Sequence, residues 1–366
     1  MPGPSNDFPS DMRGMSCLGR TRWFLLALAG CVVGALLWLQ ITKAQKPQTN
    51  AQEFEKAVAS GASSSSSDAA DRLAERSDQR SSRSSVVPLV GPPRYQGLLG
   101  QMVPGNRGPK GDPRNVMFTG MQSVPDDDLD RLDGQTDLHT LCFLAVPLKD
   151  VQMEHLKHWR QLKRLQLCRT GITDAGLKWI ADLGELTSLD IEASQEQMEI
   201  TDKGTVHIGT LTKLETLELK STRITDAGLA QLKSLTRLKE LCLNAAPLTG
   251  AGLERLKGAT HLTVLDLFAT KTNDEGLQNI KWFPDLTRLE LFGTQVTDAG
   301  VRHIKGLAEL RDLGLMYTNV SDAALEDIAS LGKLRRVQLE GTKVTAKGVK
   351  KLRKALPRCV VVWPYS

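Results

Sequence analysis

The chain has 366 residues, of which 40% are hydrophobic and 24% charged, so it is too apolar to be disordered throughout. Six cysteines in a chain of this length exclude a small disulfide-stabilised scaffold. The net charge is +5, and the first 112 residues carry +4 of it, which leaves only +1 for residues 113–366. A nearly neutral C-terminal region argues against a groove for nucleic acid, and we expect no nucleic-acid partner.

Residues 23–41 are almost entirely apolar and are expected to form a transmembrane helix. A helix of that length spans roughly 28 Å, which is close to the thickness of the hydrocarbon core of a bilayer. Three arginines precede the segment within residues 1–22 and two lysines follow it closely, a bias that predicts a cytoplasmic N-terminal tail and an extracytoplasmic remainder, in the periplasm or on the cell surface. Because no A-x-A site follows shortly, we interpret the segment as a retained signal anchor.

Two alternatives remain open for this segment. Leu28 to Cys31 matches the lipobox of bacterial lipoproteins, which would make Cys31 the site of lipidation, although ten mostly apolar residues follow it. Gly30 and Gly34 form a G-x-x-x-G pattern that allows two membrane helices to pack closely. Glycine is also common in membrane helices for other reasons, so a homo-oligomer has no firm support in the sequence.

Residues 42–112 are rich in Ser, Gln, Arg, Pro and Gly and include five consecutive serines from Ser63 to Ser67. They show no sustained apolar periodicity, so the segment cannot bury enough surface to offset its chain entropy. We predict a disordered linker that spans on the order of 45–50 Å root-mean-square between the membrane and the domain that follows.

From Leu138 onward the pattern LxxLxLxxTxITDAGLxxLxxLxx recurs every 24 residues, and a weaker unit precedes it from Val116. A fixed period in this range with this leucine spacing is typical of a leucine-rich repeat. The L-x-L pair predicts a short strand with one buried face, and the following G-L-x-x-L predicts a short helix with one apolar stripe. We therefore expect an α/β right-handed solenoid over residues 113–366, with parallel strands on its concave face, helices on its convex face and a C-terminal cap from about residue 355.

Three polar positions of the repeat have predicted structural roles. A threonine usually stands at the ninth position, where its hydroxyl can satisfy backbone groups as the chain leaves the strand. The T-D step before each helix is expected to supply the N-cap, with Asp also favoured by the helix dipole. The glycine two residues after that aspartate is expected to let the helix approach the strand closely.

Residues 113–366 resemble bacterial leucine-rich-repeat proteins with TDAGL-type units and, more broadly, the ribonuclease-inhibitor-like superfamily, which includes the repeat halves of F-box substrate adaptors. The resemblance implies that the concave face binds a protein. The F-box kinship is weaker, because the chain has no recognisable F-box and threonine replaces the cysteine or asparagine usual at the ninth position.

Signals for catalysis are poor, and we expect a protein that is not an enzyme and has no cofactor. No G-x-S-x-G, P-loop or G-x-G-x-x-G motif occurs. His155 and His158 lie three residues apart on one predicted convex helix, but no third ligand and no H-E-x-x-H motif is evident, so we interpret them as a solvated helix face and expect no metal site. Cys142 and Cys168 fall diagonally on adjacent predicted strands, where a disulfide would be strained.

The outward strand positions point to a binding surface. Phe268, Phe292 and Met316 occupy equivalent outward positions in three successive units, and Tyr317 follows Met316. We expect these side chains to form one exposed apolar strip with Asp266, Glu290 and Asp312 alongside, and exposed aromatic clusters rimmed by charge often mark binding sites. Alternatively, such a ladder only stabilises the sheet.

The sequence therefore predicts a membrane-anchored, non-catalytic interaction scaffold whose concave face binds a protein or peptide, with some preference for a basic one. Two other functions stay open: a structural or self-associating component of the cell envelope, and a relative of F-box-like substrate adaptors.

Overall fold

In the computed structural model the chain divides into two units, Met1–Lys110 and Gly111–Ser366, and the structure describes residues 114–193 and 199–363 of the second. The predicted tail, membrane segment and linker lie outside these residues. Within the described ranges, none of the helices is both long and apolar enough to cross a bilayer. Membrane anchoring through residues 23–41 therefore stays a prediction.

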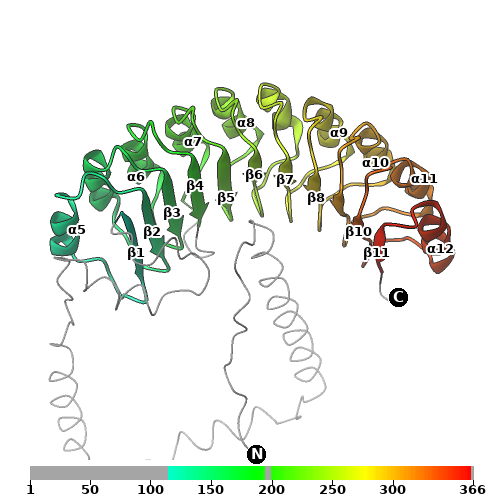
Figure 1. The fold of residues 1–366 in the computed structure, drawn as a ribbon, viewed down its shortest axis with the longest axis horizontal. Helices are drawn as coiled ribbons and strands as arrows, with labels where there is room; N and C mark the ends of the chain where they lie inside the picture. The colour runs from blue at the N-terminus through cyan, green and yellow to red at the C-terminus, as the bar shows by residue number, and fades with distance from the viewer. Residues whose placement is uncertain (1–113, 194–198, 364–366) are drawn as a thin grey trace, which may run out of the picture. The chain divides into compact units, whose positions relative to one another are not determined.

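The described residues form an arc in which one parallel sheet lines the inner, concave side and short helices cover the outer, convex side (Figure 1). The strands follow one another in chain order, each paired with the next. Their bounds are β1 (Asn115–Thr119), β2 (Thr140–Leu144), β3 (Arg164–Cys168), β4 (Ser188–Glu192), β5 (Thr216–Lys220), β6 (Glu240–Cys242), β7 (Val264–Asp266), β8 (Arg288–Glu290), β9 (Asp312–Gly314), β10 (Arg336–Gln338) and β11 (Val360–Val362). The predicted capping strand at the C-terminus is β11, and the solenoid prediction is confirmed.

Most convex segments are single turns of α-helix or 3-10 helix, as expected for repeats of 24 residues. In chain order they are α5 (Asp126–Leu132), η1 (Asp150–His158), α6 (Asp174–Leu177), η2 (Lys178–Ile180), α7 (Asp202–Ile208), α8 (Asp226–Leu229), η3 (Ala230–Leu232), η4 (Ala251–Leu256), α9 (Asp274–Leu277), η5 (Gln278–Trp282), α10 (Asp298–Ile304), η6 (Asp322–Ala324), α11 (Leu325–Ala329) and α12 (Ala346–Ala355).

The core lies between the sheet and the helices and is built from equivalent residues of successive repeats. Leu165, Leu189 and Leu217 pair in register on β3, β4 and β5, and each is 0% exposed. Two threonines interrupt the apolar pattern and are also buried. Their hydroxyls are satisfied locally, because Thr205 donates to the Asp202 carbonyl at 2.7 Å and Thr272 bonds the Thr270 hydroxyl at 2.8 Å.

The ninth-position threonines have their predicted role in the C-terminal repeats. Each hydroxyl donates to the carbonyl three residues earlier, at 2.6–2.8 Å, in Thr270, Thr294, Thr318 and Thr342. These bonds satisfy a buried carbonyl where the chain leaves the strand. In most repeats a residue after the strand, just before the threonine, adopts a left-handed backbone, for example Ser221 at φ 53° and Gly293 at φ 67°.

The T-D step supplies the N-cap as predicted, but only through its first residue, and the aspartate has a further role that was not predicted. The N-cap is the preceding threonine, serine or asparagine: the Thr225 hydroxyl, for example, accepts from Ala227 N at 3.2 Å. The aspartate carboxylate instead reaches the next repeat, where Asp202 accepts from both the backbone N–H and the hydroxyl of Thr225, at 2.7 Å each. We call this pair of bonds the aspartate staple. It recurs from Asp150, Asp174, Asp226, Asp274, Asp298 and Asp322.

The recurring glycine makes room for this staple. A Cβ at Gly228 would overlap the Asp202 carboxylate, and one at Gly176 would overlap that of Asp150. The expectation that glycine mainly lets helix approach strand is therefore incomplete, since the close neighbour is the aspartate of the preceding repeat. A side chain at these positions would displace the staple.

Candidate functional site

The predicted aromatic residues do come together, although Tyr317 rather than Met316 continues the ladder. The Phe268 and Phe292 rings stack with centroids 4.6 Å apart and planes 29° apart, and the Phe292 and Tyr317 rings lie 5.1 Å apart at 53°. We call Phe268, Phe292 and Tyr317 the aromatic strip. Both phenylalanines are half-buried, whereas Tyr317 is 62% exposed. The strip crosses three consecutive repeats and lies on the strand side of the solenoid, because Leu267 and Leu291, one residue before each Phe, point into the core.

Tyr317 occupies the left-handed backbone position of its repeat, with φ 54°. The equivalent residues in neighbouring repeats are small: Ala245, Ala269, Gly293 and Gly341. A bulky side chain in this conformation is uncommon, and strained residues of this kind cluster at functional sites. The ring lies over Gly341, where a Cβ would come 2.7 Å from Tyr317 Cδ1. The next repeat thus leaves the space that the tyrosine ring fills.

Met316 and Asp312 lie beside the strip. The half-buried Met316 sulfur accepts from Gln338 Nε2 at 3.4 Å. Asp312 pairs with Arg288 Nη2 at 3.5 Å and with Arg336 Nε at 3.9 Å. Its charge is therefore shared by two arginines, so it is not an unopposed acidic group for a basic ligand.

The prediction that Asp266 forms an exposed charged rim is wrong, because it is 0% exposed. Its Oδ1 accepts from Phe268 N at 3.0 Å, and Glu290 Oε1 accepts in the same way from Phe292 N at 3.1 Å. Both carboxyls therefore fix the backbone that presents the phenylalanines. Burial raises the pKa of Asp266 to about 6. Burial, helped by the nearby Asp266 charge, raises the pKa of Glu290 to about 8, so that Glu290 is mainly uncharged at neutral pH.

A glycine in the next repeat accommodates Glu290. Gly314 occupies the outward position beside it on β9, and a Cβ there would overlap the Glu290 carboxylate. The strip therefore rests on a buried carboxyl layer rather than on a charged surface. The expected preference for a basic ligand loses its main support, since one of these carboxyls is buried and the other is mostly neutral.

A second concave cluster lies further towards the N-terminus. Lys220 Nζ pairs with Glu218 Oε2 and lies 3.6 Å from Asp190 Oδ1. Burial and the Glu218 charge raise the pKa of Asp190 to about 6. This cluster is a compensated, largely buried ion-pair network and offers no open site.

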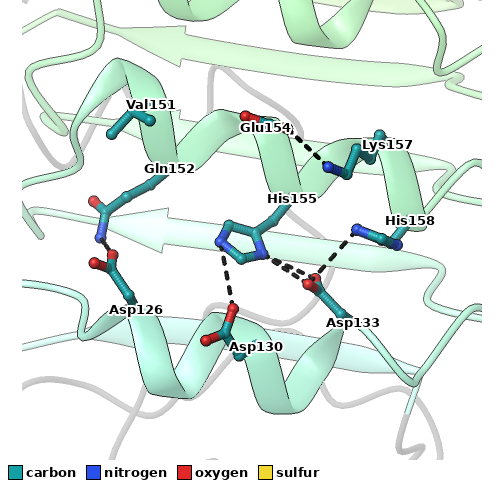
Figure 2. A pocket seen from close by; sticks show the side chains of 9 residues that line it. All are labelled: Asp126, Asp130, Asp133, Val151, Gln152, Glu154, His155, Lys157 and His158. Carbon is teal, nitrogen blue, oxygen red and sulfur yellow. Dashed lines mark hydrogen bonds and ion pairs between the residues drawn. The ribbon is translucent and has the colours of Figure 1, made fainter.

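Within the described ranges no disulfide joins the cysteines, which are Cys142, Cys168, Cys242 and Cys359. On the convex face, however, the structure adds partners that sequence reasoning missed for His155 and His158. Asp130 and Asp133 of the preceding repeat face them (Figure 2). The signal was present in the sequence, because residues about one 24-residue period apart lie side by side in a solenoid.

Comparisons with known proteins address the fold. The family described as Leucine Rich repeat matches residues 210–233. No curated protein matches the sequence. Among solved structures, an internalin (inlF) from Listeria monocytogenes is similar with a TM-score of 0.55 and 19% identity over 68% of this chain and 73% of that one. An internalin C2 (inlC2) from the same organism gives a TM-score of 0.38 and 21% identity over 66% and 84%.

At these identities the likeness concerns architecture alone. The matched repeat, the 24-residue period and the stacked parallel strands agree with one another. The described residues therefore have a leucine-rich-repeat fold.

Proposed function

We propose that this protein is a membrane-anchored scaffold that binds a segment of another protein on its concave face, with the aromatic strip as the anchor point. The observation that carries the proposal is Tyr317, a 62% exposed aromatic ring held in a left-handed backbone conformation and stacked on Phe292. A row of stacked rings that only stabilised the sheet would not require an aromatic residue at this position, because alanine or glycine occupies it in the neighbouring repeats. Exposed aromatic rings on a rigid sheet are frequent centres of protein interfaces.

The ligand that fits best contributes apolar or aromatic side chains. The phenylalanine rings are half-buried, and the Glu290 carboxyl beneath them is mainly neutral at pH 7. A ligand therefore gains contact area and aromatic stacking here rather than a strong ion pair. Repeat arcs offer an extended surface suited to an elongated protein segment.

The anchor rests on residues 23–41, whose length and hydropathy suit a single membrane span. The arginines before that segment favour a cytoplasmic N-terminus and an extracytoplasmic solenoid. Protease treatment of intact cells, or of spheroplasts if an outer membrane is present, tests this part. Digestion of the solenoid only after lysis of the membrane would contradict it.

Photo-crosslinking tests the strip directly. A photoreactive phenylalanine analogue at position 317 of the full-length chain should give a covalent adduct with a partner, and the same analogue at position 206 should not. Val206 is a suitable control because it is an exposed apolar residue on the convex helix α7. Adducts of twice the chain's own mass would indicate self-association instead, and equal labelling at both positions would contradict the proposal.

The Tyr317→Ala variant tests whether the strip is needed for binding of the partner, with Val206→Ser as the matched control. Alanine already occupies this left-handed position at Ala245 and Ala269, so the backbone tolerates the change. We expect the partner captured by the wild-type chain to be lost, with a circular-dichroism melt close to that of the wild type. Val206→Ser should keep the partner.

A further inference from the structure

A group of metal-ligating side chains gathers at the N-terminal end of the convex face. Asp130 on α5 and Asp133 just after it lie three residues apart, as do His155 and His158 on η1. The two pairs face each other across adjacent repeats (Figure 2). A shallow depression of about 400 Å³ opens over them.

The distances place one carboxylate between two imidazoles. His155 Nδ1 lies 3.0 and 2.9 Å from the two oxygens of Asp133, and His158 Nε2 lies 3.6 Å from Asp133 Oδ2. The other ring nitrogen of His155, Nε2, faces Asp130 Oδ1 at 4.0 Å. The donor set is therefore two imidazoles and one carboxylate, with a second carboxylate behind one imidazole.

We propose that this cluster binds a divalent transition-metal ion of the zinc type through His155 Nδ1, His158 Nε2 and Asp133. In tetrahedral zinc sites the metal lies about 2.0–2.2 Å from nitrogen and oxygen ligands, which puts the ligand atoms roughly 3.3 Å apart. His155 Nδ1 lies 2.9 Å from Asp133, close to that value. His158 Nε2 lies 3.6 Å from Asp133 but outside the group of ligand atoms, from Asp130, Asp133 and His155, that are all within 4.8 Å of one another, so its 38% exposed ring has to rotate toward the metal. The depression leaves the fourth position to water.

Asp130 is the positioning residue of this site. Ligating histidines commonly donate their second ring N–H to a carboxylate, which fixes the tautomer and the orientation of the ring. Asp130 faces that second nitrogen of His155. Its side chain is 66% exposed, so its removal leaves the core intact.

Independent contacts hold the two helices in register. Trp159 Nε1 donates to the Leu132 carbonyl at 3.2 Å, and Gln152 Nε2 donates to Asp126 Oδ1 at 2.7 Å. The ring of His155 also stacks on Trp159 at 6.4 Å. Because these bonds do not involve the ligand atoms, they hold the two helices that carry the ligands together before a metal arrives.

The local charge favours a cation. The depression is lined by four carboxylates and one lysine, and Lys157 pairs with Glu154 at 2.8 Å. The remaining acidic groups at the site are Asp126, Asp130 and Asp133. The two imidazoles distinguish the site from an ordinary acidic patch and favour zinc-type ions over calcium or magnesium.

A second histidine–aspartate pair serves as the internal control. His261 Nδ1 lies 3.2 Å from Asp285 Oδ2, also one repeat apart. It has a single imidazole and a single carboxylate, and both are well exposed. This pair therefore has the same histidine–aspartate contact but lacks the second imidazole that the proposed metal site needs.

Calorimetric titration of Zn²⁺ into the full-length chain, purified in detergent with any histidine tag removed, tests the proposal. We expect one zinc ion per chain. His155→Ala and His158→Ala should each weaken binding at least about 100-fold, and Asp130→Asn should weaken it about 10- to 100-fold. His261→Ala should bind like the wild type.

Cobalt provides the spectroscopic readout. Co²⁺ in the site should give the visible bands of a four-coordinate nitrogen- and oxygen-ligated ion, without the near-ultraviolet absorption of cobalt–thiolate bonds. Binding that survives the His155→Ala and His158→Ala changes, thiolate absorption, or equal affinity for Ca²⁺ would overturn the proposal. Melting curves of each variant in the absence of metal verify that the fold is retained, and His158 and Asp130 are exposed enough for that comparison.

Discussion

Replacing Asp226 by alanine tests how far the aspartate staples hold neighbouring repeats together. The carboxylate accepts four hydrogen bonds from the next repeat: Thr249 N at 2.9 Å, Thr249 Oγ1 at 2.8 Å, Gly250 N at 3.1 Å and Gly252 N at 2.8 Å. The two glycines are buried, so their N–H groups have limited access to water once the carboxylate is removed.

A hydrogen bond to a charged group contributes about 1.5–3 kcal/mol when measured alone. Asp226 is half-buried and water can enter the vacated space, so the four bonds are not additive and we expect a total loss of about 3 kcal/mol. For a domain of this size that loss corresponds to a decrease in melting temperature of roughly 6–12 °C. Asp226→Asn should lose less, because the amide oxygen can still accept from the glycines.

Thermal melts followed by circular dichroism measure the global loss, and amide hydrogen exchange at Gly250 and Gly252 reports it locally. The exposed Asp182, replaced by alanine, is the control. If Asp226→Ala destabilises the chain no more than Asp182→Ala does, the staple does not stabilise the junction and the reasoning is wrong.

Two further predictions concern the layer beneath the aromatic strip. The folded-state pKa values of Asp266 and Glu290, about 6 and about 8, lie above the ordinary values of 3.8 and 4.5. At a pH between the ordinary and the raised pKa of each group, the folded chain therefore binds more protons than the unfolded chain. Their contribution to stability is therefore complete below about pH 4 and is lost as the pH rises through 6 and 8. The difference in melting temperature between Glu290→Gln and the wild type should therefore increase in favour of the variant from pH 5 to pH 9. A difference that stays constant over this range would contradict the prediction. Gly341→Ala should destabilise the chain by roughly 1–2 kcal/mol in denaturant titrations, because φ is 70° and the new Cβ meets the Tyr317 ring. Adding Tyr317→Ala should recover part of that loss, and strict additivity of the two changes would exclude the contact.

The apolar period predicted the core well, because burial of one face by identical neighbours depends only on spacing. Leu165, Leu189 and Leu217 are all fully buried in one continuous interior. Polar positions were harder to predict, because their partners lie in the next repeat. The aspartate was expected to cap its own helix, and its carboxylate instead bonds the backbone 23–30 residues further along the chain.

The concave face shows a second limit of pattern reasoning. Alternation places Asp266 on the outward side of its strand, which suggested an exposed charge. In the structure its carboxyl folds back onto Phe268 N beside the phenylalanine ladder, so it is fully buried. Alternation predicts which face a side chain leaves from, whereas its exposure depends on what the neighbouring side chains cover.

A junction in the middle of the arc has no aspartate staple. Gly250 stands where most repeats carry aspartate, and in the following repeat Asn273 N donates to the Thr249 carbonyl at 3.2 Å instead. We expect heat or mechanical pulling to open the arc first at this point and to split it into two cooperative blocks. The histidine cluster belongs to the first block and the aromatic strip to the second. Each site should therefore survive unfolding of the block that carries the other.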